Sequence, residues 1–216
     1  DTPAFMPVAT QGSVKALAPD DLKTLGSTIL LSNTYHLMLR PGIDLIHRQK
    51  NLHTFMNWQR PILTDSGGFQ TFSLGRLRNM SDSGVIFRSH IDGREHFLSP
   101  ELSVQYQRLL GSDIAMVLDE CSPYGVGREE LNSAMERTHV WARRSRDAHD
   151  SIDQSLFAVV QGGVFPELRL ASAEILMSMD FDGYAIGGLS VGEPKEAMYN
   201  IASLMGSTLP EHKPRY

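Results

Sequence analysis

Cysteine is nearly absent from this 216-residue chain, and neither sign of charge is in large excess. The single cysteine, Cys121, excludes a disulfide framework and any cysteine-rich zinc site within these residues. The formal net charge is -5, so the chain does not have the overall basic excess that is typical of nucleic-acid-binding proteins. A local basic patch is still compatible with this net charge. No apolar run approaches the roughly 20 residues that a membrane span requires, so we expect no membrane contact.

Targeting signals and paired metal ligands are also missing. The chain opens with DTPAFMPV, without an initiator methionine or a signal-peptide pattern, and we expect a cytoplasmic protein with a cut or processed N-terminus. Its eight histidines show no HxH or HxxxH pairing, so we expect no metal site in this chain. Because 41% of the residues are hydrophobic and no linker divides the chain, we predict a single domain over residues 1–216.

The sequence repeats a pattern of a short apolar strand, a polar or glycine-containing end, and an amphipathic helix. The predicted strands cover residues 5–10, 28–35, 61–68, 113–121, 156–163 and 183–190. Their continuous apolar character is typical of a parallel sheet covered by helices. Six such units without a GxGxxG turn after the first strand favour a barrel over a dinucleotide-binding fold. We therefore predict an α/β fold, a (β/α)8 TIM barrel truncated to about six units.

Helix boundaries are marked by prolines and glycines. One helix is predicted to begin at Pro19 and stop at Gly26, and another to run from the Ser99-Pro100 cap to Gly111. Two more are predicted to begin at Phe165-Pro166 and Glu193-Pro194. A core-facing stripe at helical spacing predicts a further helix, with Leu131, Ala134, Met135, Thr138 and Ala142. Residues 84–98 alternate around Asp92-Gly93, which predicts an inserted β-hairpin.

Polar or glycine residues stand at the carboxyl ends of five predicted strands: Asn33, Asp65, Asp119, Gln161 and Gly188. Each one alone is more often a helix cap or a turn residue. Together, at the same end of successive parallel strands, they indicate one shared site, because active sites of barrels lie at that end.

The residue types of this site suit a flat ligand with a donor edge and an acceptor edge. A carboxylate can accept both N1–H and N2–H of a guanine-like ring, and an amide or peptide N–H can donate to O6. Phe69 could stack on such a ring or could simply pack in the core. A sugar or an amino acid could use the same polar groups, so the residues alone leave the ligand open.

Seven segments, in order along the chain, resemble the tRNA-guanine transglycosylases: FMPVAT, SNTYHLMLRPG, LTDSGGFQ, GSDIAMVLDEC, VVQGG, GYAIGGLSVGEP and KPRY. The resemblance implies a (β/α)8 barrel with an inserted hairpin and a zinc-binding segment late in the chain. It also implies a pentosyltransferase that exchanges guanine at the wobble position of GUN-anticodon tRNAs for a 7-deazaguanine, in queuosine biosynthesis. The expected partners are that tRNA, the base and a second copy in a homodimer.

The same resemblance implies a role for each site residue. Asp65 matches the general acid/base, Asn33 a residue that orients it, and Asp119 and Gln161 the side chains that read the purine edge. The other implied pocket residues are Ser66, Gly67, Gly68, the stacking Phe69, Gly188 with its N–H to O6, Leu189 with a carbonyl for an aminomethyl arm, and Tyr216 at the border. Cys121 and Val191 are similar to the bacterial enzymes, which use 7-aminomethyl-7-deazaguanine and not queuine.

The nucleophilic aspartate, the tRNA-anchoring loops and the zinc ligands of the family all lie beyond the position of Tyr216. We therefore expect this chain alone to lack the nucleophile and to be inactive, with no cofactor of its own. A non-catalytic transglycosylase-like partner subunit that binds base or tRNA is the alternative, and an unrelated barrel enzyme for a small polar ligand is a third. The basic stretch Arg143-Arg144-Ser145-Arg146 is interpreted as a solvated helix face and not as a tRNA site.

Overall fold

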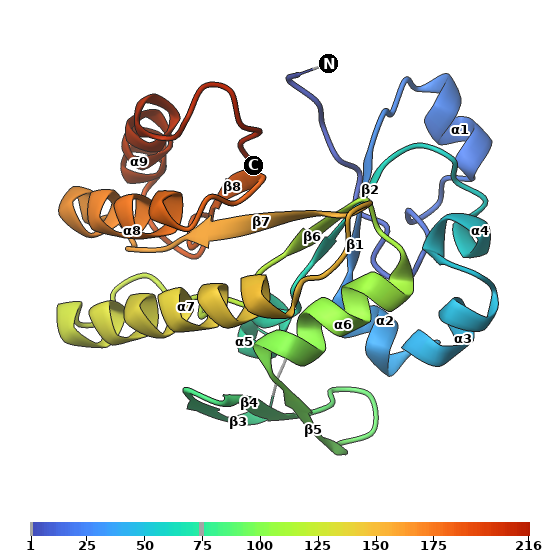
Figure 1. The fold of residues 1–216 in the computed structure, drawn as a ribbon, viewed down its shortest axis with the longest axis horizontal. Helices are drawn as coiled ribbons and strands as arrows, with labels where there is room; N and C mark the ends of the chain where they lie inside the picture. The colour runs from blue at the N-terminus through green and yellow to red at the C-terminus, as the bar shows by residue number, and fades with distance from the viewer. Residues whose placement is uncertain (1, 74–75) are drawn as a thin grey trace.

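A five-stranded parallel sheet forms the centre of the computed structural model, which describes residues 2–73 and 76–216 (Figure 1). Its strands are β1 (Leu30–Asn33), β2 (Ile62–Asp65), β6 (Ile114–Met116), β7 (Ser155–Val160) and β8 (Gly183–Ile186), in that spatial order. Each strand therefore pairs with the strand of this sheet that comes next along the chain. Nearly every residue of these strands is buried, as expected for a sheet covered on both faces. The α/β fold with a parallel sheet agrees with the prediction.

Short bridges extend this sheet at both edges. Val8 pairs with Leu31 of β1, and Arg215 pairs with Tyr184 of β8, each in parallel orientation. The prediction of a full strand over residues 5–10 is wrong, because that segment forms only the single bridge and Phe5 is 84% exposed. Pro7 has no N–H to donate, which limits the hydrogen-bond ladder at this position.

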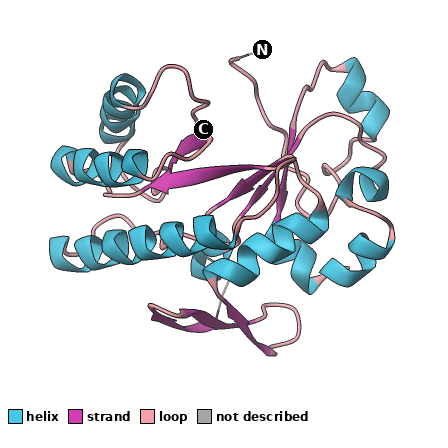
Figure 2. Cartoon of the chain, in the orientation of Figure 1, coloured by secondary structure: helices cyan, strands magenta, loops and turns pink. Residues whose placement is uncertain are grey.

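Helices follow the strands and pack on one another in chain order. The longer ones are α6 (Pro100–Leu110), α7 (Arg128–Ala148), α8 (Pro166–Ser178) and α9 (Lys195–Thr208), and successive members of this series are in contact. Figure 2 shows the same arrangement by element type, with α8 and α9 at one edge of the sheet and the helices that lie between β1 and β2 at the other. No helix within residues 2–73 and 76–216 is long and apolar enough to cross a membrane.

The predicted helix boundaries are confirmed where a capping residue marks them. Ser99 Oγ accepts the Leu102 N–H at the start of α6, and Gly111 ends that helix in the left-handed conformation, with φ 68°. Helix α1 (Pro19–Thr24) begins at the predicted proline. The predicted stripe of α7 is buried along its length, at Leu131, Ala134, Met135, Thr138 and Ala142.

Four short helices were not predicted. They are α2 (Thr34–Leu39), α3 (Ile43–Arg48) and α4 (Leu52–Met56), which lie between β1 and β2, and α5 (Gly68–Ser73), which follows β2. Helices of five or six residues contain fewer than two turns, so they show no hydrophobic period in the sequence. Helix α5 matters most, because it begins at Gly68, the last residue of the strand predicted over residues 61–68.

A second, antiparallel sheet contains β3 (Arg76–Ser81), β4 (Gly84–Arg88) and β5 (Glu95–Leu98). β4 and β5 pair around a turn that contains Asp92 and Gly93, where the hairpin is expected. β3 is an additional strand, which the arginine- and asparagine-containing sequence RLRNMS does not predict.

Helix α7 holds the turn between β3 and β4. Trp141 Nε1 donates to the Asp82 carbonyl at 2.9 Å, and Arg144 donates to the carbonyls of Asp82 and Ser83. Arg144 also forms a two-point ion pair with Glu101, at 2.7 and 2.8 Å. The interpretation of the basic stretch as a solvated face is therefore wrong for Arg144, whose charge anchors the second sheet.

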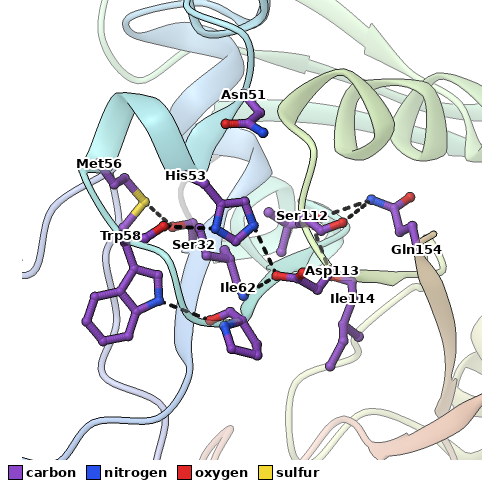
Figure 3. Close-up of polar contacts among 12 residues, drawn as sticks. Ser32, Asn51, His53, Met56, Trp58, Ile62, Ser112, Asp113, Ile114 and Gln154 are labelled. Atoms are coloured by element: carbon purple, nitrogen blue, oxygen red, sulfur yellow. Dashed lines mark hydrogen bonds and ion pairs between the residues drawn. The ribbon is translucent and has the colours of Figure 1, made fainter. Parts of the chain in front are cut away.

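The amino end of β6 is tied to the short helices through His53 (Figure 3). His53 Nδ1 donates to the Trp58 carbonyl at 2.9 Å, and Nε2 lies 3.1 Å from Asp113 Oδ2. The same carboxylate oxygen accepts the Ile62 N–H at 2.7 Å. Both partners of the imidazole are acceptors, so the doubly protonated form fits best, and the hydrogen bond to Asp113 raises the pKa of His53 above its usual 6.5. The bonds from His53 and Ile62 outweigh burial and lower the pKa of Asp113 below 3.8.

We predict that this pair stabilises the fold most between about pH 4 and pH 6.5. The contribution of His53 is complete below its unfolded pKa and is lost as the pH rises through the raised folded value, whereas the contribution of Asp113 is lost as the pH falls below 3.8. In chemical unfolding, the free energy of unfolding of wild type should exceed that of His53→Gln by more at pH 5.5 than at pH 8.5. The change in this difference should be up to about 1 kcal/mol for this partly exposed pair. Equal differences at both pH values would contradict the assignment.

Candidate functional site

The carboxyl ends of the parallel strands bring the predicted polar residues to one edge of the sheet. Asn33 at the end of β1 stands opposite Asp65 at the end of β2, in register. Asp119 follows β6, Gln161 follows β7 and Gly188 follows β8. Because the strands are parallel and neighbouring, the geometry places these residues side by side, as the sequence predicts.

The Asp65 carboxylate is held by four donors. Oδ1 accepts the backbone N–H of Thr34 at 3.0 Å and of Gly67 at 3.2 Å. Oδ2 accepts Gln70 Nε2 at 2.9 Å and also Asn33 Nδ2. Burial opposes ionisation more strongly than these bonds favour it, and it raises the pKa of Asp65 to about 6. The carboxyl group is thus fixed in orientation and able to exchange a proton near neutral pH.

Asp119 is 8% exposed and forms its own hydrogen bonds. Its Oδ2 accepts Gln161 Nε2 at 2.7 Å, and its Oδ1 accepts Ser66 Oγ at 3.4 Å. Burial, together with the charge of Asp65, raises the pKa of Asp119 to about 6. The two carboxyl groups therefore share one electrostatic environment, in which ionisation of one disfavours ionisation of the other.

Glycines are required where the backbone approaches these side chains. A Cβ at Gly68 would lie 2.5 Å from the Asp119 carbonyl oxygen and 3.0 Å from its Oδ1. A Cβ at Gly188 would lie 2.4 Å from Gln161 Oε1, and Gly188 has φ +61°. Gly67 also has positive φ, +88°. The glycine pairs that follow β2 and β8 therefore let the two loops close on Asp119 and Gln161.

The remaining predicted residues lie around this group. Phe69 is 45% exposed, which excludes plain core packing. Tyr216 is close enough to Asp65 that the charge of Asp65, in addition to burial, raises the pKa of Tyr216. Leu189 is half-buried and its side chain packs against the main core.

A cavity of about 340 Å³ adjoins the site. Gln161 and Gly188 form part of its wall, and Tyr124, Phe165 and Val191 give it an apolar lining. The site thus combines a polar group at the strand ends with an apolar space beside it, an arrangement typical of small-ligand sites.

Comparison with known proteins identifies the family. The model of the family described as "Queuine tRNA-ribosyltransferase" matches residues 1–216. The chain is 59% identical to the queuine tRNA-ribosyltransferase of Pelotomaculum thermopropionicum over 216 residues, and 56% identical to that of Desulforamulus reducens. Each alignment covers 100% of this chain and 58% of the relative. The chain belongs to the queuine tRNA-ribosyltransferase family.

This family member spans 58% of the length of the curated relatives it matches, so the rest of the relatives has no counterpart in these residues. Within the described residues, no group of three or more His, Cys, Asp or Glu side chains could hold a metal ion. Cys121 is buried next to the site residues and has no second thiol to share a metal with. Neither observation places a zinc site among the described residues.

Sequence reasoning missed several residues that support the site. Gln70 lies within the TDSGGFQ motif, and α5 brings it back to Asp65 five residues away. Ser103 Oγ of α6 donates to the Ser66 carbonyl at 2.8 Å, and Arg137 of α7 pairs with Glu120, next to Asp119. Only the motif hinted at Gln70. No sequence signal marked Ser103 or Arg137, because their partners are 37 and 17 residues away.

We predict that Asp119→Asn relieves a destabilising charge above pH 6. A carboxyl group whose pKa is raised on folding binds more protons in the native state, so stability falls as the pH rises from 3.8 to about 6. The difference in unfolding free energy between the variant and wild type should therefore shift in favour of the variant by about 2–3 kcal/mol when the pH is raised from 4 to 8. Denaturant unfolding at both pH values tests this, and a difference independent of pH would show that the carboxyl group ionises normally.

Proposed function

We propose that the protein catalyses, in its complete form, the exchange of guanine at the wobble position of GUN-anticodon tRNA for a 7-deazaguanine base. The observation that carries this proposal is the pair of carboxyl groups of Asp65, at the end of β2, and Asp119, after the neighbouring β6, whose pKa values burial raises to about 6. Family membership supports the same activity, since the relatives are named queuine tRNA-ribosyltransferases.

Asp119, Gln161 and Gly188 read the edge of the base. Asp119 accepts from the N1–H and N2–H groups of the purine, and the Gly188 N–H donates to O6. Gln161 already donates to Asp119 at 2.7 Å, which fixes the carboxylate before the base enters. Phe69 stacks on the ring from its exposed position, and Tyr216 borders the pocket beside Asp65.

Asp65 moves the proton of the reaction. It protonates the departing guanine when the glycosidic bond breaks, and it later accepts a proton from the incoming base. A pKa of about 6 suits both steps near neutral pH. Double displacement also requires a nucleophile at C1′ of the ribose, which the family resemblance assigns to a part of the complete protein outside residues 1–216. The wobble base has to leave its stack to reach this pocket.

The incoming base is 7-aminomethyl-7-deazaguanine. Val191 lines the cavity beside Gly188. We infer that its side chain takes up space that a bulkier 7-substituent, such as that of queuine, would need. The backbone carbonyl of Leu189 receives the aminomethyl group. Cys121 is buried close by and is shared with the bacterial enzymes that use this base.

The complete protein closes the parallel sheet into a (β/α)8 barrel. The sequential strand order, the matching series of helix contacts and the extra bridges at both sheet edges support this, since all three are typical of barrels. The family resemblance further supports a homodimer and a zinc site in the part of the complete protein that lies outside residues 1–216. It also supports a cytoplasmic location, where tRNA is found.

We predict that Asp65→Asn in the complete protein keeps base affinity within a few-fold and lowers base exchange by at least about a hundredfold, because the proton carrier is lost. Incorporation of labelled guanine into tRNA measures the exchange. Unchanged turnover would remove Asp65 from the chemistry. Base binding with no exchange even in the wild-type complete protein would instead favour the non-catalytic partner subunit.

We predict that Asp119→Ala weakens binding of 7-aminomethyl-7-deazaguanine to this chain by about 2–4 kcal/mol, the loss of charge-assisted hydrogen bonds in a buried site. Isothermal titration calorimetry measures the affinity, and circular dichroism checks that each protein is folded. Asp147→Asn, an exposed acid on α7, is the control and should bind as wild type does. A loss below about 1 kcal/mol in Asp119→Ala would contradict its role in reading the base.

A further inference from the structure

Arg169 of α8 is completely buried and forms no ion pair with any residue that the structure describes. Its guanidinium group donates to three backbone carbonyls: Nε to Gly163 at 2.7 Å, NH1 to Val160 at 2.7 Å and NH2 to Gly188 at 3.4 Å. Burial lowers the pKa of Arg169 to about 10. Among the described residues the charge of Glu193 acts on this guanidinium group, but no carboxylate lies within ion-pair distance, so the three carbonyl acceptors have to compensate for lost water.

The three carbonyls belong to the end of β7 and to the two loops that carry Gln161 and Gly188. Val160 ends β7 directly before Gln161, and Gly163 lies two residues after Gln161. Gly188 lies in the loop that follows β8. One side chain therefore joins the loop after β7 to the loop after β8. The planar guanidinium group carries its five donors on three nitrogen atoms in fixed directions, so it can reach carbonyls that lie farther apart than the three donors of a single ammonium nitrogen can.

The start of α8 is packed directly against the first of these loops. A Cβ at Gly162 would lie 2.8 Å from the Arg169 nitrogen, so the loop and the helix backbone are in contact there. One turn further along, Ser172 Oγ accepts the Gln161 N–H at 3.3 Å and contacts His139 Nε2 at 2.9 Å. The backbone of Gln161 is thus held from two successive turns of the same helix.

We propose that Arg169 is a positioning residue that fixes the loops after β7 and β8 relative to each other, so that the Gln161 side chain and the Gly188 peptide face one ligand. Because it fixes the Gly188 carbonyl, Arg169 sets the orientation of the peptide groups around that residue. Because it fixes the carbonyls on both sides of Gln161, it sets the direction from which Gln161 Nε2 reaches Asp119. The identity of the ligand as a purine base rests on the proposed function, whereas the coupling of the two loops does not.

Hydrogen–deuterium exchange of the ligand-free chain tests the loop coupling. Arg169→Lys keeps the charge but not the three-way geometry, and Arg169→Met removes both. Each should speed exchange of peptides over 160–165 and 186–192 by about tenfold or more, with β1 and β2 unchanged. Leu176→Ala is the matched control, because it shortens a fully buried side chain of the same helix that has no hydrogen-bonding group to hold either loop.

The proposal is overturned if exchange in both loops is unchanged, or if Leu176→Ala speeds it equally at the same loss of melting temperature. Should neither Arg169 variant fold, the wild-type chain provides the decision. Its Arg169 Nε–H resonance should exchange slowly with water, and fast exchange would overturn the proposal.

Affinity for 7-aminomethyl-7-deazaguanine gives a second readout. Arg169→Lys should bind about 10- to 100-fold more weakly than wild type, a loss expected when groups are displaced by about 1 Å. Leu176→Ala, at matched stability, should bind as wild type does, and equal affinities for wild type and Arg169→Lys would overturn the proposal. No binding by the folded wild-type chain would count against the proposed function alone, since the exchange experiment still decides the role of Arg169.

Discussion

The carboxyl groups of Asp65, at the end of β2, and Asp119, shortly after β6, lie close together, and the rest of the site depends on keeping them there. Burial disfavours their charged forms, so the surrounding structure has to supply hydrogen-bond donors. Asp65 receives four of them, from the start of α2, from its own loop and from α5. Asp119 receives its donors from Ser66 and Gln161. The helices and loops around the strand ends are therefore arranged to satisfy these two groups.

The same constraint accounts for the lack of bulk at the strand ends. Donors can approach a buried carboxyl group closely only if the backbone that carries them meets no side chain on the way. Gly68 permits this at Asp119, and Gly188 permits it at Gln161. Helix α8 then holds the glycine-rich loops in place from behind, through Arg169 and Ser172. Arg169 thus places a positive charge next to these loops.

Outside the site, polar contacts at distant points support the sheet. His53 and Asp113 connect the amino end of β6 to the short helices, and Arg144 joins α7 to the second sheet. A buried network around Gln107 of α6 also links Thr64 of β2 to the backbone of Met116 in β6. These contacts fix the relative positions of β2 and β6, the two strands that deliver the carboxyl groups.

The sequence by itself determined the features that depend on neighbouring residues. Continuous apolar runs indicated the parallel strands, prolines and glycines marked the longer helices, and the polar ends of the strands indicated one shared site. These are local signals, because the spacing of apolar residues, the helix-capping residues and the polar residues at strand ends can each be recognised from a short stretch of consecutive residues. The run at 5–10 was misleading for the same reason, since its apolar residues form only one bridge, at the sheet edge next to Pro7.

Only the tertiary structure decided how the site is held. Arg169 meets Gly188, and Ser103 meets Ser66, across helices and loops that are distant in the sequence. Whether an arginine on a helix is exposed, as Arg143 is, or buried, as Arg169 is, depends on which residues the fold places opposite it. The raised pKa values of Asp65 and Asp119 also depend on the fold, because the burial of both groups and the approach of the Asp65 charge to Asp119 exist only once the strands are side by side.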